Sequence, residues 1–161
     1  MNGAGTPFLI QAKREARFLS GREPGLVARA LGMIGTVKPY FLAHEMIHAG
    51  LSPEHAIQAV RLSLASDGYR PQIKEQTIVV RQGSDLVTRL FGLILAAGRN
   101  AVPVGLTVTV EGTTDGSHVR LEAYDRLGPY LDKKTSKRLA AIVDERMQRL
   151  IQSAKKNIQS Q

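Results

Sequence analysis

The stretch LTVTVEGTTDGSHVRLEAY, residues 106–124, decides the fold. Apolar and polar side chains alternate on both sides of a loop at residues 112–116. Successive side chains of a strand point to opposite faces, so this alternation predicts an antiparallel hairpin with one apolar and one polar face. Helices are then needed to cover the apolar face. The apolar positions are Leu106, Val108, Val110, Val119, Leu121 and Ala123.

Helical patterns lie on both sides of this hairpin. Residues 52–66 predict a helix, with Ser52 as N-cap and Pro53 at its first position. Residues 132–156 predict a long amphipathic helix at the C-terminal end. Its expected buried stripe consists of Leu139, Ile142, Val143, Met147, Leu150 and Ile151.

A strand and a further helix are predicted between these elements. Residues 72–81 end in four strand-favouring residues and predict a strand. Residues 85–97 predict a helix that follows a turn and ends at Gly98. We expect this helix to bury one side, which carries Leu86, Leu90, Leu93 and Ile94.

The whole pattern predicts an α+β fold. We expect a small, mostly antiparallel sheet of three or four strands, with helices on one face and the long C-terminal amphipathic helix among them. Residues 1–36 are expected to form an N-terminal helical segment, with one helix at residues 7–19 and a second that begins at Pro24. Residues 37–161 are expected to form the α+β domain, with a single core overall.

Composition narrows the class of protein. The 161 residues contain no cysteine, which excludes disulfides, thiolate metal ligands and cysteine nucleophiles. Aromatic residues make up only 5%, so the core must consist mainly of aliphatic side chains. The first residues lack the pattern of a signal peptide, and the most apolar run, residues 90–97, is far shorter than the roughly 20 residues that span a bilayer. We expect a cytoplasmic protein without a transmembrane segment.

Charge is distributed unevenly along the chain, whose net charge is +8. Residues 1–38 hold six basic and two acidic side chains, residues 39–125 hold seven and nine, and residues 126–161 hold nine and three. Basic ends around a mildly acidic middle indicate contact with an anionic partner, namely nucleic acid, a membrane surface or an acidic protein. Basic residues at the start of a helix oppose its dipole, which favours an anion-binding role for those of the last helix. They are Lys133, Lys134, Lys137 and Arg138.

One short motif points to a different function. Residues 44–48, HEMIH, resemble the HExxH motif of zinc metallopeptidases. On a helix, His44 and His48 would share a face and bind one zinc ion, and Glu45 would act as general base on a zinc-bound water. The resemblance covers these five residues.

The surroundings of the motif leave two local structures open. A catalytic zinc ion needs a third protein ligand, and the positions where a longer metzincin motif has glycine and histidine hold Leu51 and Glu54. Residues 40–49 fit a helix, because Pro39 and Gly50 suit its ends, and they also fit a first strand that leads into the helix at residues 52–66. On a strand Glu45 points away from both histidines, and the catalytic geometry is lost.

These observations favour a non-catalytic binding or assembly module whose basic terminal helices contact an anionic partner. On this hypothesis no cofactor is needed. A small zinc metallohydrolase with His44, Glu45 and His48 is the alternative from another class. A small domain that binds an apolar ligand between the sheet and the last helix is a third possibility. The sequence leaves the oligomeric state open.

Overall fold

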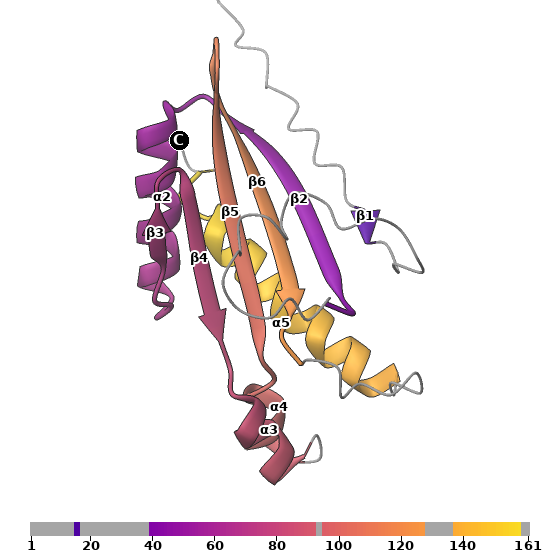
Figure 1. Ribbon diagram of the computed structural model, residues 1–161. Coiled ribbons are helices and arrows are strands. Elements are labelled where there is room, and N and C mark those ends of the chain that lie inside the picture. The colour runs from indigo at the N-terminus through magenta and orange to yellow at the C-terminus, as the bar shows by residue number, and fades with distance from the viewer. Residues whose placement is uncertain (1–14, 17–38, 93–94, 128–136, 159–161) are drawn as a thin grey trace, which may run out of the picture.

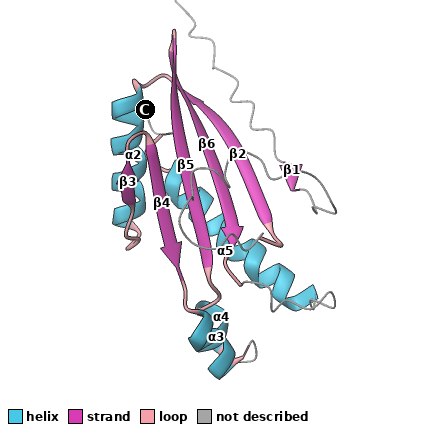
Figure 2. Cartoon of the chain, viewed as in Figure 1, coloured by secondary structure: helices cyan, strands magenta, loops and turns pink. Residues whose placement is uncertain are grey.

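The computed structural model describes residues 15–16, 39–92, 95–127 and 137–158, which form an α+β fold (Figures 1 and 2). A sheet forms one layer, and two helices lie against one of its faces. In chain order the elements are β1 (Glu15–Ala16), β2 (Leu42–Ala49), α2 (Pro53–Ser66), β3 (Gln72–Lys74), β4 (Thr77–Gln82), α3 (Asp85–Phe91), α4 (Ala96–Asn100), β5 (Val104–Thr113), β6 (Gly116–Asp125) and α5 (Lys137–Lys155).

The sheet is antiparallel throughout its described part, with strand order β1-β2-β6-β5-β4-β3. The predicted hairpin forms its centre: β5 and β6 pair from Val104 opposite Asp125 to Thr113 opposite Gly116. The expectation of three or four strands is wrong, because five strands, β2 to β6, make up the sheet and the two-residue β1 adds to its edge. Helix α2 connects β2, near one edge, with β3 at the other.

The core lies between one sheet face and the helices α2 and α5, which contact each other (Figure 1). Every apolar position predicted for the hairpin is fully buried on this face. The fully buried side chains of the strands are joined there by Val60 and Leu64 of α2 and by Val143 and Leu150 of α5. The alternation in the sequence therefore predicts correctly which side of β5 and β6 faces the core.

Residues 42–49 are strand β2, which decides between the two local structures left open by the sequence. The inward positions Ala43, Glu45, Ile47 and Ala49 are buried, and the positions between them are exposed or partly buried. Strand β2 pairs with β6 along its whole length. This pairing satisfies the backbone groups that a helix would have satisfied internally, and it places the apolar side of the segment on the core.

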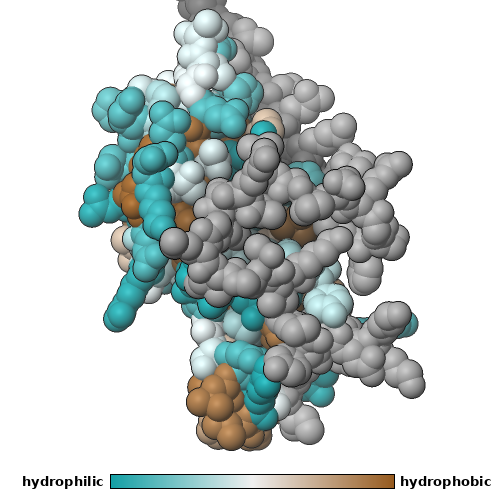
Figure 3. All heavy atoms as spheres, in the orientation of Figure 1, coloured by the Kyte–Doolittle hydropathy of each residue, from teal (hydrophilic) through white to brown (hydrophobic). Residues whose placement is uncertain are grey.

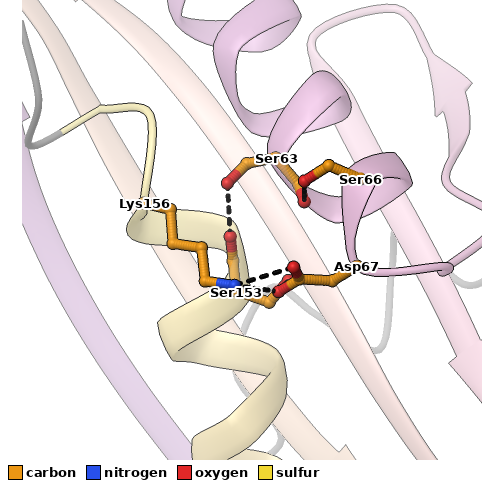
Figure 4. A network of polar contacts seen from close by, with 5 residues as sticks. All are labelled: Ser63, Ser66, Asp67, Ser153 and Lys156. Atoms are coloured by element: carbon orange, nitrogen blue, oxygen red, sulfur yellow. Dashed lines mark hydrogen bonds and ion pairs between the residues drawn. The ribbon is translucent and has the colours of Figure 1, made fainter.

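Helices α2 and α5 are also joined by polar contacts (Figure 4). The buried Ser63 hydroxyl donates a hydrogen bond to the Ser153 carbonyl, at 2.6 Å. Asp67, the residue that ends α2, accepts hydrogen bonds from the Ser153 hydroxyl at 2.6 Å and from the Lys156 ammonium at 2.6 and 2.7 Å. These bonds fix the end of α5 against the end of α2.

The two other predictions in the middle of the chain need correction. The strand expected at residues 72–81 is a hairpin, because the chain turns at Glu75, which has a positive φ of 53°, and separates β3 from β4. The helix expected at residues 85–97 is two short helices, α3 and α4. Two residues of the side that was expected to be buried, Leu86 and Leu90, are exposed.

Much of the N-terminal prediction lies outside the described residues. Of the helix expected at residues 7–19, the structure describes only Glu15 and Ala16, which form strand β1 instead. The second expected helix, which begins at Pro24, and the first residues of the predicted C-terminal helix, 132–136, are also outside the described part. Among the helices that are described, none is both long and apolar enough to cross a membrane.

Candidate functional site

The side chains of the HEMIH motif point to opposite faces of the sheet. His44 and His48 lie on the face away from α2 and α5, where both are exposed. Glu45 points into the core, where it forms an ion pair with the buried Lys155 of α5. The arrangement required for an HExxH zinc hydrolase, with the glutamate beside two histidines on one helical face, is therefore absent at these residues.

The histidines have other neighbours on that outer sheet face. His48 is paired in register with His118 of β6, and their ring centroids are 5.2 Å apart. The Nε2 atom of His48 lies 3.6 Å from a carboxylate oxygen of Asp115. Within residues 15–16, 39–92, 95–127 and 137–158, no three histidine, aspartate or glutamate side chains come together in a group that could hold a metal ion.

His44 is paired in register with Glu122 of β6. Burial raises the pKa of the Glu122 carboxyl, and the nearby charges of Arg120 and His44 lower it to a smaller extent. A carboxyl that is harder to ionise than usual can mark a catalytic acid, but structural sites produce the same effect. Because His44 and Arg120 already surround Glu122, we interpret it as part of a polar sheet face.

Two of the four predicted anion-binding residues lie at the start of the last helix as the structure describes it. Lys137 and Arg138 are exposed in the first turn of α5. Lys133 and Lys134 lie outside the described residues. The two described cations are thus available on the surface at a helix end whose dipole disfavours positive charge.

A second group of cations surrounds a hollow of about 190 Å³ between α4 and α5, which we call the arginine pocket. It is lined by Arg99, Asn100, Ile142, Glu145, Arg146 and Arg149. Helix α4 ends at Asn100, and α5 contributes the last four residues. Its described lining thus contains three arginines and one glutamate, a formal charge of +2.

Hydrogen bonds to two other segments of the chain fix the Arg146 side chain in the arginine pocket. Its guanidinium donates one hydrogen bond to the carbonyl of Asn100 and another, of 3.0 Å, to the side-chain oxygen of Gln82 at the end of β4. Its Nε atom is buried and has no hydrogen-bond partner in the described part of the chain. Arg146 therefore holds α4, β4 and α5 together while one of its donors stays unsatisfied.

Electrostatics in the arginine pocket favour the arrival of an anion. Burial lowers the pKa of the Arg146 guanidinium, and the neighbouring positive charge of Arg149 lowers it further, whereas Tyr69 and Glu145 raise it. Arg149 forms an i,i+4 ion pair with Glu145, and both side chains of that pair are well exposed. A bound anion would offset the repulsion between guanidinium groups and supply acceptors for their N–H groups.

The sequence patterns did not reveal the arginine pocket. Arg146 and Arg149 are three residues apart, which predicts only that they share a helix face. Asn100 lies 46 positions before Arg146, and only the tertiary structure, in which Arg146 bonds to the Asn100 carbonyl, brings Arg99 to the same hollow. The sole hint in the sequence was the concentration of positive charge in residues 126–161.

Comparison with known proteins gives no family for this chain. No protein-family model matches the sequence, and a search of curated proteins finds no match.

Proposed function

We propose that the protein is a non-catalytic binding module that contacts an anionic partner through the arginine pocket. The observation that carries the proposal is that Arg99, Arg146 and Arg149 line one hollow, whose described lining holds one carboxylate, Glu145. The planar guanidinium group presents several N–H donors and matches phosphate or carboxylate geometry better than an ammonium group does. The exposed Lys137 and Arg138 on the same helix extend the positive surface.

The form of the arginine pocket argues against two other functions. Its described lining residues include no nucleophile and no paired acid and base, which catalysis of a group transfer requires. It is lined mainly by charged and amide side chains, so it differs from the apolar pocket that the third hypothesis requires. Binding of an anionic group is the chemistry that its lining residues support.

Titration calorimetry with inorganic pyrophosphate tests the proposal. The double substitution Arg99→Ala/Arg149→Ala removes two pocket cations and leaves Arg146, which is bonded to Asn100 and Gln82, in place. Because hydrogen bonds to charged groups contribute about 1.5–3 kcal/mol each, we expect the affinity to fall by roughly tenfold or more. The matched control, Lys137→Ala/Arg138→Ala, removes the same charge outside the pocket and should have a much smaller effect.

The two double variants also separate specific binding from general attraction. Equal losses in both would mean that pyrophosphate responds only to net charge, and the pocket would not be the site. A larger loss for Lys137→Ala/Arg138→Ala would place the site at the start of α5. Absence of pyrophosphate binding by the unmodified chain at low ionic strength would contradict the proposed function itself.

A further inference from the structure

Four large apolar side chains are exposed on the α3–α4 projection, and we call them the apolar tip: Leu86, Leu90, Phe91 and Leu95. Their exposed fractions are 67%, 70%, 46% and 53%. Helices α3 and α4 project beyond the end of the sheet, and apolar residues gather on the surface there (Figures 1 and 3). A soluble domain seldom leaves so many large apolar side chains together in water without a partner for them.

The packing of the projection explains why the apolar tip faces outward. Helices α3 and α4 contact each other and make little contact with the rest of the described chain. They approach through glycines: a Cβ atom on Gly98 would lie 1.7 Å from the carbonyl oxygen of Gly92. Because this contact has no room for side chains, the large apolar residues cannot pack between the two helices.

Positive charge surrounds the base of the same projection. The arginine pocket lies there, because α4 ends at Asn100 and contributes Arg99 and Asn100 to its lining. Arg81, in the strand that leads into α3, is also exposed. An apolar tip next to a cationic base matches the interface of an anionic bilayer. There the apolar acyl chains lie next to a layer of phosphate headgroups.

We propose that the apolar tip inserts into the interface of an anionic lipid bilayer while the arginine pocket contacts a headgroup phosphate. This inference rests on the proposed function and names its partner. Interfacial insertion reaches about 5–10 Å, which suits the side chains of two short helices and requires no membrane-spanning segment. The arginine side chains extend their charged ends to the headgroups while the leucines enter the acyl region.

Two other occupants fit the observations less well. Nucleic acid would satisfy the arginine pocket but would offer solvated phosphates, not an apolar medium, to the apolar tip. A second copy of the chain, joined tip to tip, would bury the leucines but would bring two positively charged bases close together. An anionic bilayer satisfies both the apolar and the cationic parts.

Fluorescence gives a direct test, because the chain contains no tryptophan. In Phe91→Trp the single indole would report on the apolar tip. With phosphatidylcholine vesicles that contain phosphatidylserine, we expect a blue shift of its emission. Tyr40→Trp, at a similarly exposed position outside the tip, should show no shift. A shift of equal size in both variants, or in neither, would overturn the insertion.

A matched pair of leucine substitutions measures what the tip contributes to binding. Leu90 and Leu62 are both exposed on helices, but Leu62 belongs to α2, away from the tip. In vesicle sedimentation, Leu90→Glu should weaken binding by roughly tenfold or more, because one leucine no longer enters the apolar phase and a negative charge replaces it. Leu62→Glu should bind nearly as well as the unmodified chain. Equal binding by both variants would exclude insertion of the tip.

Failure of this inference can be distinguished from failure of the proposed function. Pyrophosphate binding that is lost in Arg99→Ala/Arg149→Ala, without any vesicle binding, would keep the anion site and overturn the lipid partner. Self-association that Leu90→Glu abolishes, without vesicle binding, would identify a second copy as the occupant and likewise overturn it. Vesicle binding that requires both the tip and the pocket supports the two proposals together.

Discussion

Glu45 and Lys155 form a buried ion pair that joins β2 to α5 across 110 positions of the sequence. Removal of one partner from such a pair leaves an uncompensated charge in the core, which costs about 3–5 kcal/mol. We therefore expect Glu45→Gln to lower the free energy of unfolding by an amount of this order. Urea denaturation followed by circular dichroism measures the change.

A double variant is the control for that prediction. Glu45→Leu/Lys155→Met replaces both charges with apolar groups, and such replacements are often neutral or stabilising. It should be more stable than Glu45→Gln. If Glu45→Gln unfolded at the same urea concentration as the unmodified chain, Glu45 would not have the structural role assigned here.

Gly105 allows the Tyr124 side chain to lie across strand β5. A Cβ atom at position 105 would lie 2.5 Å from the Tyr124 ring, and Tyr124 is buried. Gly105→Ala should therefore lower the free energy of unfolding by about 1–3 kcal/mol, because the ring must move. Gly50→Ala is the matched control, since nothing lies within 4 Å of its added Cβ atom. Equal thermal stability of the two variants would contradict the packing of Tyr124 over Gly105.

Asp67 makes the stability of the α2–α5 contact depend on pH. Hydrogen bonds from Lys156 and Ser153 lower the pKa of its carboxyl below the ordinary value of 3.8. The folded state thus binds this proton less readily than the unfolded state does. The stabilisation is complete at pH values above the pKa that Asp67 has in the unfolded state. It is lost as the pH falls below 3.8 and passes through the lower pKa of the folded state.

Asp67→Asn should remove this acid-dependent part of the stability. The measurement is the unfolding free energy across the acid range, compared with that of the unmodified chain. Asp144→Asn, which alters an exposed carboxylate on α5, should leave the acid dependence unchanged. Identical pH profiles for Asp67→Asn and the unmodified chain would show that the Asp67 contacts do not contribute.

Glu145 competes with any anion for the guanidinium of Arg149. An exposed ion pair of this kind contributes about 0.2–1 kcal/mol, so Glu145→Gln should tighten pyrophosphate binding up to about fivefold. Asp144→Asn, at the adjacent residue, changes the net charge by the same amount as Glu145→Gln and serves as the control. Equal tightening in both variants would mean that only total charge matters.

Much of the fold could be predicted because its signals are local. The alternation in residues 106–124 and the Ser52–Pro53 start of α2 are correct in the structure. Residues 40–49 were ambiguous because Glu45, a charged residue, occupies an inward strand position. Its partner Lys155 lies in the last helix, and no short-range pattern connects the two.

The functional surface was harder to predict, because it depends on contacts between distant segments and on a broken helix. The apolar pattern of residues 85–97 suggested a buried side, but α3 ends at Phe91 and α4 packs on it through Gly98, which leaves Leu86 and Leu90 exposed. The sequence also could not show that Arg99 lines the same hollow as Arg146 and Arg149, since the end of α4 and helix α5 come together only in the tertiary structure.

Mapping of pyrophosphate on the protein by nuclear magnetic resonance tests the central claim most directly. In a titration of the isotope-labelled chain, we expect the largest shifts at the guanidinium and amide signals of Arg99, Arg146 and Arg149. The signals of Lys137 and Arg138 should move much less. Shifts that centre on Lys137 and Arg138, or that spread evenly over all exposed cations, would contradict an anion site in the arginine pocket.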